Sequence, residues 1–225
     1  VYSVTMSIAG VASLFAGVFN TIWAPMVYRW VSEGIDVKRI DEVASYVLAA
    51  VYFLIVLSGI FAWILPYLLP EEYKAIRYLI TLCLIGPLLY TLSETTAIGI
   101  AISKKTIFSM LSSIGAMLSN LLGNYILVPG YGALGAAIST AVAFFVFYVL
   151  RTEFSCLAWR QVPRIKSYIL VSALIILSVI SAVENNSLYM FSVLWIAMFF
   201  LGVYVFFQPL KVVFEKIRVS FFDFN

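Results

Sequence analysis

The chain has 225 residues, of which 64% are hydrophobic and only 11% are charged, whereas about 25% are charged in an ordinary soluble domain. A soluble protein of 25.1 kDa cannot hide that much apolar surface from water. The composition therefore excludes a soluble globular protein and predicts an integral membrane protein. The formal net charge of +3 is too small to indicate a nucleic-acid partner.

The chain contains no histidine, which excludes HExxH zinc sites, Ser-His-Asp triads and His-ligated haem. The two cysteines, Cys83 and Cys156, lie far apart and form no CxxC or other metal-binding pattern. The sequence therefore predicts no metal site, no cofactor and no enzymatic activity.

Seven continuous apolar segments follow one another along the chain. A helix needs roughly 20 apolar residues to cross a bilayer, and only the sixth segment is marginal in length. The runs are continuous rather than alternating, which favours helices over barrel strands. We therefore expect an all-α integral membrane protein with about seven transmembrane helices. The segments are 4–28, 43–65, 75–102, 107–128, 133–150, 168–183 and 188–207.

Lysine and arginine are unevenly divided between the two sides. The loops after the first, third and fifth segments and the C-terminal tail hold twelve of the fourteen cations, and the other two are Lys74 and Arg77. Cytoplasmic loops are enriched in Lys and Arg. The pattern therefore predicts a cytoplasmic C-terminus and a Val1 end outside.

The chain starts at Val1 without methionine, just before an apolar segment. We expect it to be a piece of a longer protein, with N-terminal processing as the alternative. If the complete protein starts in the cytoplasm, an odd number of transmembrane segments precedes Val1.

Glu94 is the one clear charge inside an apolar segment. It lies ten residues before Lys104, or about 15 Å along a helix, between the bilayer centre and the cytoplasmic face. Charged residues within membrane spans are costly and usually functional. Glu94 is therefore predicted to line a substrate path or to take up a coupling proton. A glutamate that ties two helices together is an equally good interpretation.

Two asparagines, Asn120 and Asn124, share one helical face of the fourth segment. Such a pair either lines a wet cavity or bonds to a neighbouring helix, and the second interpretation is favoured.

Asn20, on the first segment, and Arg29, directly after it, are further cavity candidates. Arg29, Arg77 and Arg151 all lie at segment ends, where we expect their side chains to extend to the membrane interface. Of these three arginines, Arg29 is the best candidate for an additional role.

Proline and glycine mark bends and a reversal. Pro25 and Pro87 are expected to bend the first and third segments, because proline lacks a backbone donor and clashes with the preceding turn. A tight reversal followed by a small-residue packing face is expected between the fourth and fifth segments. Its residues are Pro129, Gly130, Gly132 and Gly135.

Four stretches in chain order carry a family resemblance: TIWAPMVYR, LPEEYKAI, GIAISKKT and SNLLGNYILVPGYGALGAAIST. Together they resemble the Wzx-type polysaccharide flippases of the multidrug/oligosaccharidyl-lipid/polysaccharide exporter superfamily, which has a MATE-like fold. The resemblance covers roughly residues 1–160.

Members of that family have two lobes of six helices, often followed by two more. The resemblance implies that residues 1–150 are five spans of the second lobe, which lacks its first helix here. Residues 151–207 would then be a cytoplasmic loop and two additional spans, and 208–225 a cytoplasmic tail.

The implied function is to flip an undecaprenyl-pyrophosphate-linked oligosaccharide, such as an O-antigen unit of lipopolysaccharide, across the bacterial inner membrane. The implied partners are this lipid-linked sugar, membrane lipids, the missing first lobe and the polysaccharide polymerase machinery. A pyrophosphate calls for cations, and we expect none inside a span of this chain.

Three alternatives stay open. The first is a cation-coupled multidrug exporter of the same fold, in which Glu94 is a drug or proton site. The others are a membrane enzyme of polysaccharide assembly and an inactive fragment.

Overall fold

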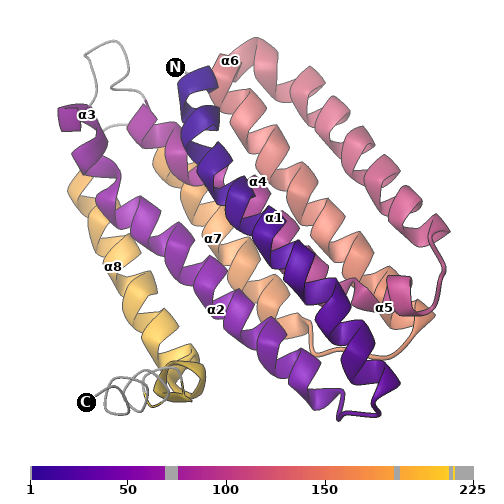
Figure 1. Cartoon of the computed structure of the whole chain (residues 1–225). Helices are drawn as coiled ribbons and strands as arrows, with labels where there is room; N and C mark the ends of the chain where they lie inside the picture. Colours follow the sequence, from indigo (N-terminus) through magenta and orange to yellow (C-terminus); the bar gives the residue numbers. More distant parts are fainter. Residues whose placement is uncertain (1, 69–75, 185–187, 213–214, 216–225) are drawn as a thin grey trace.

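A computed structural model describes residues 2–68, 76–184, 188–212 and 215, and these form a bundle of helices without any strand (Figure 1). Residue 1 and most of the expected tail at 208–225 lie outside the described residues. The longer helices are α1 (Tyr2–Ser32), α2 (Lys38–Phe61), α4 (Ile76–Thr96), α6 (Ile107–Ala158), α7 (Ile165–Val183) and α8 (Leu188–Val205). The shorter ones are η1 (Ala62–Ile64), α3 (Leu65–Leu68) and α5 (Ile98–Ile102).

All seven apolar segments are helical where the structure describes them. Within the described residues, four helical stretches are long and apolar enough to cross a membrane: Lys38–Ile64, Ile76–Thr96, Ile107–Ala158 and Ile165–Val183. This supports the expected all-α membrane class, while the number of crossings stays a prediction. The expected third segment is divided by a turn at Ala97 into α4 and α5.

Helix α6 contains the fourth and fifth segments and turns back on itself. At Gly132 the backbone leaves helical geometry, with φ 54° and ψ −126°, a region that glycine adopts without steric cost. Figure 1 shows the two arms of α6 running side by side. Phe108 stacks on Phe154 with ring centroids 5.0 Å apart, so the arms pair along their whole length.

The arms approach closely because small residues line their contact. A Cβ atom on Gly123 would lie 2.4 Å from the Ser139 hydroxyl oxygen, and one on Gly135 would lie 2.5 Å from the Leu127 carbonyl oxygen. Small residues allow helix backbones to approach in membranes, where van der Waals packing drives association.

Helix α4 is at the centre of the bundle. It packs against α1, α2, α6 and α7, and most of its residues are buried. Helix α8 packs on the far side of α2, where the Tyr52 hydroxyl donates a hydrogen bond of 2.8 Å to the Met198 carbonyl oxygen. Residues near the two ends of α4 therefore lie where several helices meet.

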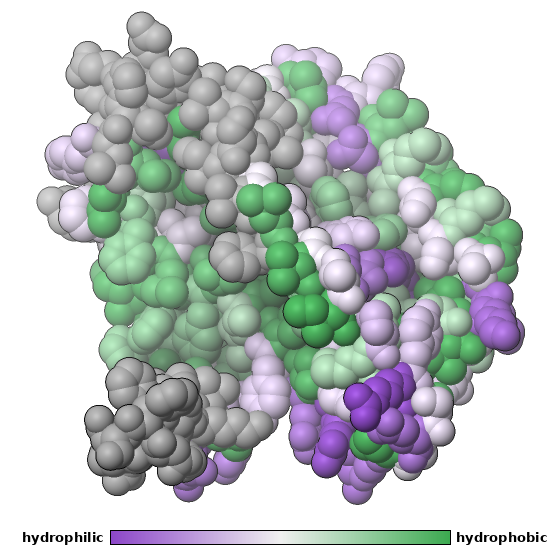
Figure 2. Space-filling view, in the orientation of Figure 1, coloured by the Kyte–Doolittle hydropathy of each residue, from purple (hydrophilic) through white to green (hydrophobic). Residues whose placement is uncertain are grey.

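The polar loops collect at the ends of the bundle. Figure 1 shows the connections α1–α2, α5–α6 and α6–α7 at one end, the lower end in that view. These are the connections that the distribution of Lys and Arg predicts to be cytoplasmic. Figure 2 shows hydrophilic residues gathered at the same end and hydrophobic ones over much of the side of the bundle.

The α6 reversal offers a test of close packing. We expect Gly135→Ala to lower the free energy of unfolding by about 1–3 kcal/mol, because the new methyl group meets backbone rather than a flexible side chain. Thermal unfolding in detergent measures the effect. Gly130→Ala is the control, because nothing lies within 4 Å of its added Cβ. Equal stability of the two variants would contradict the tight contact.

Candidate functional site at the Glu94–Arg151 ion pair

Glu94, near the end of α4, forms an ion pair with Arg151 in the second arm of α6. The distance from the Glu94 Oε1 to the Arg151 Nη1 is 2.5 Å, and the side chains are 21% and 13% exposed. The same Nη1 donates a hydrogen bond of 2.9 Å to the Ser93 hydroxyl oxygen. The pair thus joins the central helix to the α6 hairpin.

Arg151 has a partner on α4 that the sequence did not predict. The apolar run ends at Leu150, which suggested a side chain at the interface. Helix α6 instead continues to Ala158, so Arg151 lies two helical turns before the end and turns towards α4. Arg151 is therefore an interior residue of helix α6, while the expectation that no span interior of this chain holds a cation stays a prediction.

Aromatic and polar side chains enclose the pair. The Arg151 Cζ lies 5.1 Å from the Phe147 ring centroid, at cation–π distance. Tyr90 stacks on Phe147 with centroids 6.1 Å apart and an interplanar angle of 6°. On the opposite side, the Trp23 indole N–H of α1 donates to the Glu94 backbone carbonyl at 3.1 Å. Three helices therefore fix the geometry of the pair.

The arrangement is neutral as a whole but energetically demanding. Two charges taken out of water lose their hydration, and their attraction repays this only when the geometry is good and hydrogen bonds satisfy the remaining atoms. Here the Arg151 Nε is buried without a hydrogen-bond partner in the described structure. Arg151 therefore retains unused donor capacity beside a partly buried carboxylate.

A groove lies next to the pair, between α4 and the two arms of α6. Its volume is about 450 Å³, within the roughly 300–1,000 Å³ typical of small-molecule sites. Tyr90 and Phe147 belong both to the groove and to the surroundings of the ion pair, so the two are continuous. The lining residues are Tyr90, Ser113, Ala116, Met117, Asn120, Thr140, Ala143, Phe144 and Phe147.

Of the two predicted asparagines, Asn120 lines this groove and contacts the second arm of α6, whereas Asn124 bonds to Asn120 within the first arm. The Asn124 amide donates a hydrogen bond of 2.9 Å to the Asn120 side-chain oxygen, and Asn120 reaches the Thr140 hydroxyl at 3.4 Å. The Ser139 hydroxyl donates to the Asn120 carbonyl at 2.9 Å. The contacts of Asn120 with Ser139 and Thr140 join the two arms of α6, and Asn120 also borders the groove.

The structure does not bring Asn20 and Arg29 to this groove. The Asn20 Oδ1 is buried on α1 with no hydrogen-bond partner among the described residues. The Arg29 side chain is 76% exposed and pairs with Glu33 at 2.7 Å. The hydrogen bond that Arg29 donates to the Glu33 carboxylate raises the pKa of Arg29, so the guanidinium is charged at the end of α1.

Pro25 and Pro87 lie inside helices that continue through them. Each removes one backbone donor, and the Thr91 hydroxyl donates a hydrogen bond of 2.9 Å to the Pro87 carbonyl oxygen. Neither proline ends its helix. The bends expected there stay a prediction.

Sequence reasoning identified Glu94 but missed Arg151, Tyr90 and Phe147. A positive charge that directly follows an apolar run looks like an interfacial residue, and aromatic residues in such a run look like ordinary core. The one sequence signal for Arg151 was the Glu94 carboxylate, because a charge inside an apolar segment requires a cation from another helix.

The described residues contain no group of three or more Cys, Asp or Glu side chains placed to hold a metal ion. No family model matches the chain, and neither a curated protein nor a solved structure matches it.

The cost of an unpaired charge can be measured. We expect Arg151→Met to lower the free energy of unfolding by about 2 kcal/mol, less than the 3–5 kcal/mol of a fully buried pair, because both partners are partly exposed. Arg164→Met is the matched control. It breaks the 2.5 Å pair of Arg164 with Glu153, which is 26% and 39% exposed and should contribute about 0–1 kcal/mol.

Thermal unfolding is measured for the two single variants and for the double variant Arg151→Met/Glu94→Gln. Glu94→Gln should recover part of the loss in the Arg151→Met protein, because it removes the uncompensated charge. An equal loss in Arg151→Met and Arg164→Met would show that burial does not strengthen the first pair.

Proposed function

We propose that the chain is part of a flippase that moves a polyprenyl-pyrophosphate-linked oligosaccharide across the bacterial inner membrane. The observation that carries the proposal is Arg151, a cation inside the helical bundle that packs on Phe147, one of the residues that line the groove. The family resemblance of the sequence points to the same function.

The physical problem of such a transporter is desolvation. Sugars and phosphates cannot cross about 30 Å of hydrocarbon without replacing their hydration. The groove offers hydrogen-bonding groups on Ser113, Asn120 and Thr140 for the sugar hydroxyls. Its apolar aromatic wall suits the lipid part of the substrate.

Arg151 provides the corresponding contact for the pyrophosphate. In the structure its charge is balanced by Glu94. A pyrophosphate that enters the groove would compete with the carboxylate, since guanidinium binds phosphate oxygens with strong, charge-assisted hydrogen bonds. The carboxylate would restore the resting state after release, so that Arg151 does not hold the product.

The orientation belongs to the same proposal. The pair lies towards the basic end of the bundle, where the substrate would enter from the cytoplasm. Alternating access would expose the groove to each side in turn. We propose that a first lobe of the MATE-like fold forms the other wall of the cavity.

A second candidate is a cation-coupled multidrug exporter of the same fold. The observation in its favour is Glu94 beside the stacked rings of Tyr90 and Phe147, because a carboxylate and aromatic faces together attract organic cations. Arg151 competes directly for that site, which disfavours this candidate.

The first test replaces the two charged residues of the ion pair in the bacterium that makes the protein. We expect Arg151→Gln to reduce surface polysaccharide by about tenfold or more. Glu94→Gln should reduce it less, because Arg151 can still bind the pyrophosphate but lacks the carboxylate that displaces the product. Polysaccharide gels and membrane protein levels measure the effect, with Arg164→Gln as the control.

Drug susceptibility of the same strains separates the two candidates. A normal polysaccharide level with increased sensitivity to cationic drugs would replace the flippase with the exporter. If neither readout changes while the protein is present, the ion pair is only a structural connection between helices.

The second test concerns orientation. In intact cells, a membrane-impermeant maleimide should label Gly130→Cys, and it should label Lys105→Cys only after permeabilisation, because the basic loops are expected in the cytoplasm. Both positions are exposed. Cys83 and Cys156 are buried and free, so the background should be low. The reverse labelling pattern would contradict the proposed orientation.

A further inference from the structure

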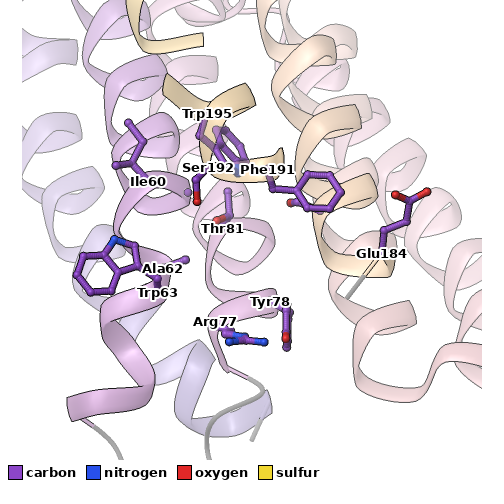
Figure 3. Close-up of a pocket in the computed structure, with 12 residues that line it drawn as sticks. Ile60, Ala62, Trp63, Arg77, Tyr78, Thr81, Glu184, Phe191, Ser192 and Trp195 are labelled. Atoms are coloured by element: carbon purple, nitrogen blue, oxygen red, sulfur yellow. The ribbon is translucent and has the colours of Figure 1, made fainter. Parts of the chain in front are cut away.

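A second pocket lies at the opposite end of the bundle from the Glu94–Arg151 pair. It is formed where α2 ends, α4 begins, α7 ends and α8 begins, and its cavity volume is about 50 Å³, with the remainder of the site open to the outside. Figure 3 shows Arg77, Tyr78, Thr81 and Glu184 around it. The residues of this second pocket are Gly59, Ile60, Ala62, Trp63, Arg77, Tyr78, Thr81, Ser181, Glu184, Phe191, Ser192 and Trp195.

Arg77 gives this pocket a positive charge in an apolar setting. Its guanidinium carbon lies 4.3 Å from the Tyr78 ring centroid, and its Nε is buried with no hydrogen-bond partner among the described residues. On the side of the membrane that the charge pattern assigns to the exterior, Arg77 and Lys74 are the only cations in the sequence. The expectation that Arg77 merely extends towards water does not account for its buried donor.

Glu184 gives the same pocket a negative charge. The carboxylate comes from the end of α7 and is exposed. Arg77 and Glu184, both described by the structure, do not form an ion pair within 4.0 Å. Five other pairs of described residues do. The pocket thus presents two separated charges of opposite sign.

Aromatic and hydroxyl groups complete the pocket. Trp63 is about half exposed, whereas Trp195 is buried against Gly59. Tryptophan and tyrosine favour the level of the lipid headgroups, which places the pocket at the membrane interface. The Ser181 hydroxyl donates its proton to the Ser178 carbonyl at 3.0 Å, so its lone pairs can accept from a cationic group near Glu184.

We propose that this pocket binds the zwitterionic headgroup of a phospholipid of the outer leaflet. The phosphate would contact Arg77, and the ammonium group would lie near Glu184, Ser181 and the aromatic rings. The argument is charge complementarity: separated positive and negative groups at the depth of the headgroups match a phosphate and an amine joined by a short linker. A purely anionic headgroup would leave Glu184 facing a like charge.

The test uses the purified full chain and native mass spectrometry of retained lipids. The probes are palmitoyl-oleoyl phosphatidylethanolamine, the corresponding phosphatidylglycerol and soluble phosphoethanolamine. We expect the ethanolamine lipid to bind about tenfold more tightly than the glycerol lipid, the ratio that corresponds to 1.4 kcal/mol.

Three variants and one control assign the binding to the pocket. Arg77→Gln should lose this lipid, and Arg77→Lys should keep most of it, because an ammonium still binds phosphate as a point charge. Glu184→Gln should bind both lipids about equally, because the like charge that opposes phosphatidylglycerol is removed. Lys105→Gln, an exposed cation at the other end of the bundle, should behave as the unmodified chain, and melting temperatures confirm folding.

Several outcomes would overturn the proposal. Equal retention of the two lipids by the unmodified chain contradicts a zwitterionic site. An equal loss in Arg77→Gln and Lys105→Gln contradicts a site in this pocket. Binding of soluble phosphoethanolamine that depends on Arg77 and matches the lipid in affinity would assign the pocket to a free ligand instead. None of these readouts depends on flippase activity, so failure here leaves the proposed transport untouched, and the reverse holds as well.

Discussion

The need to satisfy polar groups without water organises this bundle around α4. In hydrocarbon, an unsatisfied backbone or side-chain group costs several kcal/mol. Helix α4 meets this requirement locally: the hydroxyls of Thr91, Ser93 and Thr95 each donate to a carbonyl three or four residues earlier. The carboxylate of Glu94 cannot be satisfied in this way. Glu94 requires a cation from another helix, and Arg151 of α6 supplies it.

This requirement also explains the arrangement of neighbouring helices. Trp23 of α1 donates to the Glu94 backbone carbonyl, and Thr152, one residue after Arg151, shares a hydrogen bond of 2.7 Å with Thr96 of α4. Helices α1, α4 and α6 are thus linked around the end of α4. The groove beside this link has a fixed wall of Tyr90 and Phe147, so a charged ligand would meet preorganised groups there.

Much of the fold could be predicted from the sequence, because hydrophobic length and turn residues are local properties. The apolar segments coincide with helices, and Gly132, in a turn that also contains Pro129 and Gly130, reverses the chain. The partner of Glu94 was not predictable in the same way. It lies 57 residues away, and the helix that carries it does not end where its apolar run ends. Which face of that helix meets α4 depends on the packing of both arms, which no local pattern specifies.

The reversal at Gly132 has a mechanical consequence. Because the arms of α6 join without a connecting loop and interlock at Gly123 and Gly135, they form a single stiff lever. Widening the groove then requires this lever to swing away from α4 as one piece. The compliant points for such a swing are the short joint around α5, where Lys104 has a φ of 56°, and the stretch that follows Ala158. Gating of the groove would therefore be controlled from the basic end of the bundle, far from the bend itself.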